Sequence, residues 1–280
     1  MKLILSILAL VLLVQVNGQG RVDGFFKGKG NLDFVLNGSY ENNKNYFAGT
    51  KKVTIPREIV IANVYVAYGI TNRLDVNFSL PYISVNSSNK GIQDASLFFK
   101  YKVLNINSNR KLFYYLPKGY SATVSVAGGI ATNFTNYQTE GGSALGQQAK
   151  ILDLRPLIHI NLPKGFFTTL QAGYGFKLNP TPHAFSPAIK VGTAMSKFYA
   201  DVWYEYQHSF GGLDYQGTPK PSSFKELGVN YHKIGGTFYM PVKKNFGIFA
   251  GVTYLIGGRN TSQGLGINAG IVLKHYTKII

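Results

Sequence analysis

Apolar and polar residues alternate along most of this chain with a period of two, the spacing of a β-strand with one apolar face. In the segment 74–80, for example, Leu74 and Val76 alternate with Asp75 and Asn77. We predict twelve strands of this kind, most of them long enough to cross a bilayer obliquely. Their ranges are 30–41, 58–70, 73–84, 94–105, 119–132, 148–162, 165–178, 185–196, 198–210, 224–240, 245–256 and 264–276.

The connections between these segments alternate between short and long. The short ones lie near Thr71–Asn72, Pro163–Lys164, Ser196–Lys197 and Pro241–Lys244, with a longer exception at 105–118. The long ones are rich in residues that favour turns and cover 42–57, 85–93, 133–147, 179–184, 211–223 and 257–263. Short turns at one end and long loops at the other are typical of bacterial outer-membrane barrels. We therefore predict an all-β protein, a transmembrane antiparallel up-and-down β-barrel of about twelve strands.

The composition supports a barrel that spans a membrane. The chain has 32 Gly, 19 Tyr and 19 Phe, and after the N-terminus it has no apolar run as long as the roughly 18 residues of a membrane-spanning helix. Aromatic residues form girdles at both membrane interfaces of such barrels. A soluble β-sandwich also alternates, and the period alone does not separate the two. Strand length favours the barrel, because the predicted strands are about twice the usual globular length.

The N-terminus predicts export. Lys2 is followed by a short apolar run, and Gly18 suits the last position before a cleavage site, so we predict a signal peptide at 1–18. The barrel domain then covers 19–280, with residues 19–29 forming either a periplasmic tail or a short plug. The chain has no Cys, which excludes disulfides and thiolate chemistry. Export and the barrel pattern together predict a porin-like protein in the outer membrane of a Gram-negative bacterium.

Glycines and two prolines interrupt the predicted strands. In a tightly curved wall, glycines relieve crowding or mark bulges. Pro156 and Pro187 lack the N–H that the ladder of a sheet needs, so we expect bulges or strand ends near the barrel rim at these positions.

The most specific motif of the chain lies between Val64 and Tyr82. A strand leads into the tight turn Gly69-Ile70-Thr71-Asn72-Arg73-Leu74 and a second strand ending in Leu80-Pro81-Tyr82, and Gly91-Ile92-Gln93-Asp94 and Lys100-Tyr101-Lys102 follow. This stretch of about 40 residues resembles the outer-membrane transporter family named after the meta-pathway of phenol degradation. In that family a similar hairpin leads to Gly-x-x-Asp and to a strand ending in Lys-Tyr-Lys or Lys-Tyr-Arg. The resemblance implies a barrel that passes small hydrophobic or aromatic compounds.

Ionisable residues of the strands are expected to face the barrel interior, because a charge on the lipid face costs about 2–4 kcal/mol at the midplane. The candidate lumen-lining residues, which are also the candidate solute contacts, are Asp75, Lys100, Lys102, Asp153, Arg155, His159, Lys177, Lys190, Asp201, Glu205, Glu226 and His232. Gln171, Asn230 and Lys274 are assigned to the same face. The interior is either a polar constriction that selects solutes by rings of charge or a salt-bridged filling of a narrow barrel. Twelve strands are consistent with both, since they lie between the filled eight-stranded and the open sixteen-stranded barrels.

The sequence carries no signature of catalysis or of a cofactor. None of the five His has metal-ligand spacing to a second His, and no glycine loop is followed by the Lys-Ser/Thr of a phosphate site. His208 and Ser209 are adjacent strand residues that face opposite sides, so they cannot pair with each other as a dyad. A barrel phospholipase would need His159 or His232 to meet a Ser of a neighbouring strand. We expect no enzyme, no catalytic residues, no metal, no cofactor and no nucleic-acid partner.

The formal net charge of +17 shapes the functional hypotheses. The first is an outer-membrane channel or transporter for small, aromatic or anionic solutes, surrounded by outer-membrane lipid. Its net basic lumen would attract anions through Lys100, Lys102, Arg155, Lys177 and Lys190. The alternative is a structural or surface-interaction barrel with a plugged lumen, whose loops at 42–57, 133–147 and 211–223 meet partners at the cell surface. The lysines also have a simpler interpretation, as solvated charges that maintain solubility.

Overall fold

The computed structural model describes residues 22–107 and 119–277, so the predicted signal peptide lies outside the described residues. Within these two ranges, thirteen strands form one antiparallel sheet. They are β1 (Leu32–Ala48), β2 (Lys51–Gly69), β3 (Leu74–Val85), β4 (Asn89–Ile92), β5 (Asp94–Asn107), β6 (Ser121–Asn133), β7 (Ile151–Asn161), β8 (Phe166–Lys177), β9 (Ala184–Ala194), β10 (Tyr199–Ser209), β11 (Asn230–Lys243), β12 (Phe246–Arg259) and β13 (Thr261–His275). Two short 3₁₀ turns, η1 (Pro163–Gly165) and η2 (Phe224–Glu226), lie in connections.

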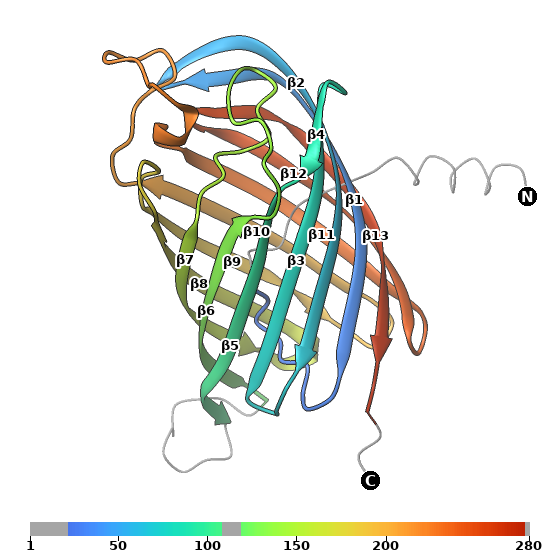
Figure 1. Cartoon of the computed structure of the whole chain (residues 1–280). Helices are drawn as coiled ribbons and strands as arrows, with labels where there is room; N and C mark the ends of the chain where they lie inside the picture. The colour runs from blue at the N-terminus through green and yellow to red at the C-terminus, as the bar shows by residue number, and fades with distance from the viewer. Residues whose placement is uncertain (1–21, 108–118, 278–280) are drawn as a thin grey trace, which may run out of the picture.

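The sheet closes into a barrel, as Figure 1 shows. β1 pairs with β2 on one side and with β13 on the other, which joins the two ends of the sheet. β4 and β5 pair with successive parts of β3, so together they occupy the position of one strand in the barrel wall. The thirteen strands therefore make a twelve-stranded barrel. The predicted twelve-stranded up-and-down barrel is confirmed. No helix among the described residues is long and apolar enough to span a membrane.

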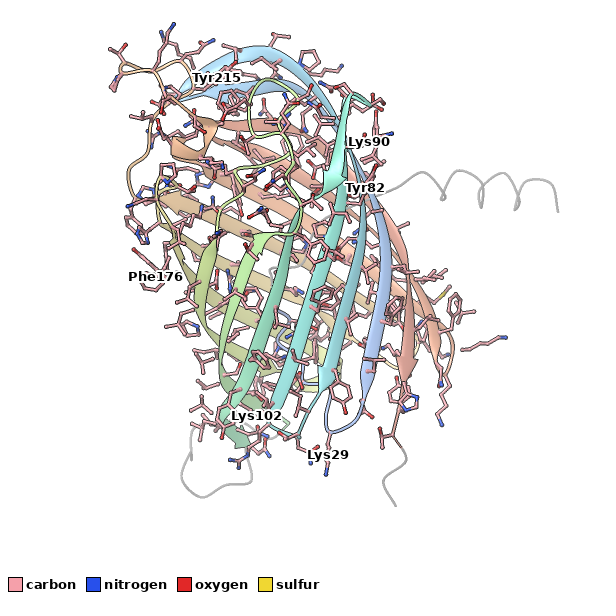
Figure 2. The ribbon with its side chains drawn as sticks, viewed as in Figure 1. Lys29, Tyr82, Lys90, Lys102, Phe176 and Tyr215 are labelled. Atoms are coloured by element: carbon pink, nitrogen blue, oxygen red, sulfur yellow. The ribbon has the colours of Figure 1, made fainter. Side chains whose placement is uncertain are left out.

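The alternation of the sequence places apolar side chains on the outer face. On β10, Val202 is 65% exposed, whereas its neighbours Asp201 and Trp203 point inward and are buried. Figure 2 shows Tyr82 and Phe176 pointing away from the barrel. A belt of exposed apolar side chains around a closed sheet satisfies the two demands of lipid, an apolar surface and no free backbone edge.

Two of the predicted polar loops are strands in the structure. β1 and β2 run through 42–57 and leave only the turn at Gly49–Thr50, and β12 and β13 run through 257–263 on either side of Asn260. The prediction of loops at these places was therefore wrong. The first hairpin extends to the loop end of the barrel, where Figure 1 shows β1 and β2 arching over it. A strand that has left the lipid no longer needs an apolar outer face, so its sequence looks like a polar loop.

The two prolines lie inside strands and not at strand ends. Pro156 pairs with Val126 on β6, but the β7–β8 ladder skips the rungs at positions 155 and 156. Pro187 likewise pairs with Ala172 on β8, while the β9–β10 ladder is interrupted beside it. A proline lacks one N–H, so it disturbs only the ladder toward which that N–H would point. The strand can therefore continue through it.

Inward-facing rings lie against glycines of the neighbouring strand. A Cβ at Gly129 on β6 would come within 2.5 Å of the ring of Phe98, and one at Gly270 on β13 within 2.6 Å of the ring of Phe249. The absent side chains leave room for these rings inside a narrow barrel. This confirms the expectation that strand glycines relieve crowding.

Candidate functional site in the barrel lumen

An N-terminal segment, residues 22–31, lies inside the lumen, where Figure 1 draws it as a blue coil within the barrel. Val22 is 1% exposed and packs in an apolar cluster with Phe98. The ring centroid of Phe25 lies 4.3 Å from that of His159. Of the two roles left open for residues 19–29, a tail or a plug, the described part therefore takes the second.

The buried ion pair of Lys100 and Asp75 holds this segment. Lys100 Nζ lies 3.4 Å from Asp75 Oδ2, and both side chains are 1% exposed. The same ammonium donates hydrogen bonds to the backbone carbonyls of Asp23 and Phe25. Asp75 Oδ2 accepts the backbone N–H of Lys27 at 3.1 Å. Both predicted lumen residues thus bind the plug directly.

A second buried cation, on β9, also binds the plug. Lys190 Nζ lies 3.6 Å from Asp201 on β10 and 3.7 Å from Asp23 of the N-terminal segment. Burial opposes ionisation of Asp23, but Lys190, Lys27 and Lys100 together outweigh it and hold its pKa below the ordinary value. The segment is therefore anchored as a carboxylate between cations.

Arg155 forms a third buried cluster on β7. Its guanidinium lies 3.3 Å from the carboxylate of Asp153, and Nη1 donates to Gln171 Oε1 at 3.1 Å and to the backbone carbonyl of Ser186. The side chain of Arg155 is only 2% exposed. Asp153, Arg155 and Gln171 therefore point into the barrel, as predicted.

The two histidines considered for a Ser–His pair have other partners. His159 Nδ1 lies 2.7 Å from Thr169 Oγ1, and its Nε2 lies 3.1 Å from Asn161 Oδ1. His232 Nδ1 lies 2.7 Å from the hydroxyl of Tyr204. In the part of the chain that the structure describes, neither imidazole is hydrogen-bonded to a serine.

His232 does not line the lumen, contrary to the prediction. It lies on the outer face of β11 together with Ile234, and its ring centroid is 4.7 Å from that of Tyr206. Its neighbour Lys233 faces inward instead, 3.6 Å from Glu41. The assignment failed because polar groups are tolerated outside the barrel near the headgroup region, where a charge does not meet hydrocarbon.

Glu226 also lies outside the lumen. β11 begins at Asn230, so Glu226 belongs to η2 in the connection that follows β10. Hydrogen bonds from the hydroxyl and backbone N–H of Ser222 lower the pKa of this exposed carboxylate. The predicted strand 224–240 started too early because the apolar residues of the loop continue its pattern.

The remaining candidates line the interior in less buried positions. Lys102 Nζ lies 4.5 Å from the ring centroid of Phe26, and Glu205 accepts a hydrogen bond from Tyr231. Lys177 follows Gly175 by two positions on the inner face of β8. Lys274 Nζ lies 4.8 Å from the ring centroid of Tyr239.

The buried charges of the lumen are balanced. Within residues 22–107 and 119–277, the three cations with buried side chains are Lys100, Arg155 and Lys190, and each forms an ion pair with an aspartate. Of the two interiors that the sequence left open, this favours the salt-bridged one. A paired cation attracts a passing anion much less than a free one, because its field is cancelled at short range.

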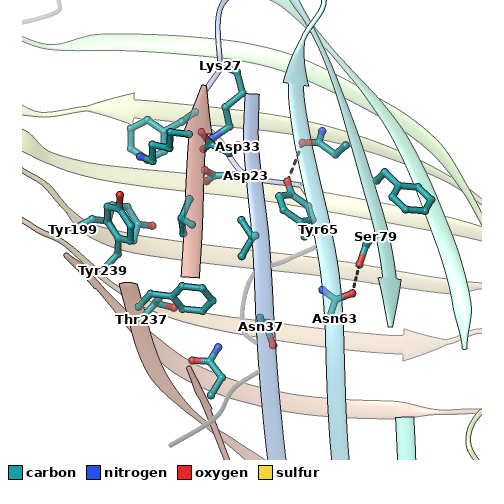
Figure 3. A pocket seen from close by; sticks show the side chains of 18 of the residues that line it. Asp23, Lys27, Asp33, Asn37, Asn63, Tyr65, Ser79, Tyr199, Thr237 and Tyr239 are labelled. Carbon is teal, nitrogen blue, oxygen red and sulfur yellow. Dashed lines mark hydrogen bonds and ion pairs between the residues drawn. The ribbon is translucent and has the colours of Figure 1, made fainter. Parts of the chain in front are cut away.

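A cavity of about 540 Å³ remains beside the N-terminal segment (Figure 3). Its wall comes mainly from one continuous arc of the barrel, from β10 through β13 to β1, β2 and β3. Amide side chains and aromatic rings predominate among its lining residues, which include Asn37, Asn63, Asn77, Asn268, Ser79, Thr237, Tyr65, Tyr199, Tyr239 and Phe249. Its charged lining residues are Asp23, Lys27, Asp33 and Lys274, of which Lys27 and Asp33 form an ion pair of 2.6 Å.

These cavity residues were not selected from the sequence. The alternation places Asn77 and Ser79 on the polar face with Asp75, but only ionisable residues were chosen as candidates. The available signal was the run of inward asparagines on neighbouring strands, and only the pairing of the strands reveals that they meet.

The loop after β6 covers the lumen at the end opposite the short turns. Its Tyr137 and Leu145 pack against Ile61 and Ile83, which line the inner wall there. The hydroxyl of Tyr137 donates to Asp94 at 2.6 Å. Burial and this hydrogen bond raise the pKa of Tyr137.

The loop after β10 is hydrogen-bonded to the loop after β6. Glu140 accepts hydrogen bonds from the hydroxyl of Ser223 at 2.7 Å and from the backbone N–H of Phe224. Gln147 donates to the carbonyls of Phe224 and Leu227. The two loops predicted as surface loops at 133–147 and 211–223 therefore form one cap over the mouth.

Solved outer-membrane barrels resemble this structure. The COG4313 outer membrane channel from Pseudomonas putida F1 matches with a TM-score of 0.68 at 11% identity, over 93% of this chain and 100% of that one. The NanC porin matches with a TM-score of 0.53 at 11% identity, over 86% and 98% of the two chains. The CymD monoaromatic hydrocarbon channel reaches 0.46 at 9% identity over 89% and 90%, too low to carry an argument.

No family model and no curated protein matches the sequence. The resemblance to the family named after phenol degradation therefore stays a prediction. At these identities the solved structures establish architecture, and the chain has the fold of the outer-membrane β-barrel channels.

Proposed function

We propose that this protein is an outer-membrane channel for the passage of small solutes. The observation that carries the proposal is the cavity of about 540 Å³ inside a closed barrel whose outer face is apolar. Its size suits a small molecule, and its lining combines rings with a few placed polar groups, as ligand sites do. The similarity in fold to the COG4313 outer membrane channel supports the same assignment.

The solute that fits best is uncharged and has an apolar face. Ion pairs occupy Lys100, Arg155 and Lys190, so these three cations give little support to the anion preference proposed from the net charge. The rings of Tyr65 and Tyr239 border the cavity and offer surfaces on which a flat solute can pack. Aromatic compounds, implied by the sequence resemblance, satisfy this condition.

Passage requires the plug or the cap to move. The N-terminal segment fills one side of the lumen, and the loops after β6 and β10 close the mouth. The structure thus corresponds to a closed state of the proposed channel.

Conductance in planar bilayers tests the proposal. We expect small discrete steps for the mature chain and larger ones for a variant that lacks residues 22–29. Deleting the same number of residues from the exposed tip of loop 210–229 controls for the deletion itself. A bilayer that stays sealed with both the mature chain and the plug deletion, across many insertions, would contradict a channel.

The closed lumen also favours the second candidate, a surface-interaction barrel that never opens. In that case the cap loops 134–150 and 210–229 would meet the partner. Trimming them would then abolish binding to the partner at the cell surface without changing the bilayer result. Unchanged binding after trimming would remove this candidate.

A further inference from the structure

We propose that the lumen cavity is a binding site for a neutral, polyhydroxylated ring solute, the chemistry of a mono- or disaccharide. The inference names a solute class for the channel proposed above and depends on that proposal only for the route into the cavity.

Four asparagines from adjacent strands form what we call the amide belt: Asn37 of β1, Asn63 of β2, Asn77 of β3 and Asn268 of β13. Asn37 and Asn63 are direct cross-strand partners, so their amides lie side by side on the inner wall. Figure 3 shows the side chains of this wall around the cavity, with Ser79 hydrogen-bonded to Asn63. The belt presents several amides to one small volume.

Part of the hydrogen-bonding capacity of the belt is unused. Asn77 Oδ1 accepts the hydroxyl of Tyr65 at 2.9 Å, but its Nδ2 is buried and has no partner among the described residues. In the same part of the chain, Asn37 Oδ1 is also buried without a partner. Buried polar atoms are almost always paired, so an unpaired donor and an unpaired acceptor beside one cavity point to a ligand that supplies both. A hydroxyl group both donates and accepts.

Glycines stand opposite two amides of the belt. Asn37 pairs with Gly270 on β13, and Asn268 pairs with Gly251 on β12. Because these positions carry no side chain, the ring of Phe249 packs over Gly270 and Asn268 Oδ1 lies close to Gly251. The rings of Phe249 and Tyr239 border the cavity. A sugar ring offers hydroxyls at its edge for the amides and C–H groups on its faces for such rings.

The charged and polar groups around the cavity favour a neutral sugar over a sugar acid and over an aromatic hydrocarbon. Lys27 and Asp33 are already paired at 2.6 Å, Asp23 is held by Lys190, and Lys274 Nζ lies 4.8 Å from the ring centroid of Tyr239. A sugar acid would have to desolvate its carboxylate to enter, which costs affinity that a neutral sugar keeps. An aromatic hydrocarbon has the required lack of charge and apolar face, but it would leave the amide atoms without hydrogen-bond partners, so a sugar is favoured over it.

Calorimetric titration of the mature chain in an amine-oxide detergent tests the proposal, since maltoside detergents carry the chemistry of the probe. The probes are maltose, glucuronate and toluene. We expect saturable binding of maltose and at least about tenfold weaker binding of the other two. Asn37→Leu and Asn77→Leu should each weaken maltose binding about 5–10-fold, while Asn42→Leu, an exposed position of the same strand, should leave it unchanged.

Three results would overturn the inference: no saturable maltose binding, maltose binding that persists in the Asn37→Leu/Asn77→Leu double variant, or tighter binding of toluene than of maltose. A heat-modifiable shift on a gel shows that each variant is folded. If the variants do not fold, the comparison of maltose and toluene binding by the wild-type chain still tests the inference. Tighter binding of toluene than of maltose would contradict an amide-belt site. Liposome swelling keeps the two proposals apart. Swelling without maltose binding sinks only the sugar site, whereas binding without any flux sinks only the channel.

Discussion

The indole ring of Trp203 lies against Gly235, its cross-strand partner on β11. A Cβ at Gly235 would come within 2.3 Å of Trp203 Cζ2 and within 2.6 Å of the backbone carbonyl of Val252. The ring fills the lumen only because its neighbour has no side chain. Pairs of this kind show how a barrel of twelve strands accommodates a well-filled interior.

Gly235→Ala should therefore overpack the wall and destabilise the barrel by about 1–3 kcal/mol. Trp203 is the chain's one tryptophan, so a shift in its fluorescence should accompany the loss of stability in a urea titration. Gly128→Ala is the matched control, because nothing lies within 4 Å of a Cβ there, and it should change neither quantity. Equal stability of the two variants would contradict the packing account.

Lys100→Met should destabilise the barrel by about 3–5 kcal/mol, because it leaves Asp75 buried without a counter-charge. The substitution also removes two hydrogen bonds to the N-terminal segment, so conductance in bilayers should rise. Adding Asp75→Asn should recover most of the stability but not the contacts to the plug. The control is Lys102→Met, which loses only a contact with the ring of Phe26 and should cost less than about 1 kcal/mol. A Lys100→Met variant as stable as this control would refute a strong buried pair.

Val202→Arg should cost about 2–4 kcal/mol of folding free energy in phospholipid bilayers, since Val202 is 65% exposed within the apolar belt. His232→Arg should cost at most about 1 kcal/mol, because this outer position lies at the polar margin of the belt. Guanidinium titration of vesicle-inserted protein measures both. Similar costs would mean that the two positions do not differ in depth.

Tyr137→Phe should loosen the cap, because it removes the hydrogen bond to Asp94 inside an apolar cluster. Limited proteolysis within loop 134–150 should become about tenfold faster. The raised pKa of Tyr137 also sets a pH dependence: its contribution is complete below the ordinary tyrosine pKa of about 10 and disappears as the pH rises through the raised value. Protection of the wild-type loop should then be constant from neutral pH to about 9. Tyr82→Phe, on the exposed outer face, should show no effect at any pH.

The period of two, together with the strand length and the alternation of short turns with long loops, was sufficient to predict the barrel and most of the orientations within it. Asp75, Lys100, Asp153 and Arg155 point inward as expected, because hydrocarbon penalises a charge on the outer face. The same rule failed at His232, since the penalty vanishes near the headgroups.

The hairpin of β1 and β2 shows a second limit of pattern reading. Its outer half exposes polar residues such as Lys52, Thr54 and Glu58, so the pattern predicted a loop, although the backbone ladder continues without regard to side-chain polarity. Pairing between strands is a backbone interaction, and local composition reports it only where one face meets lipid.

The amino-acid sequence by itself determined that this chain forms a closed barrel, because alternation and strand length are local properties set by the contrast between lipid and a polar interior. The plug formed by residues 22–31 and the amide belt were decided only by the tertiary structure. The segment has no periodic pattern, and its position depends on charges supplied by β3, β5 and β9. The belt depends on which strands become neighbours and on where glycines leave space, and both follow from closure of the sheet.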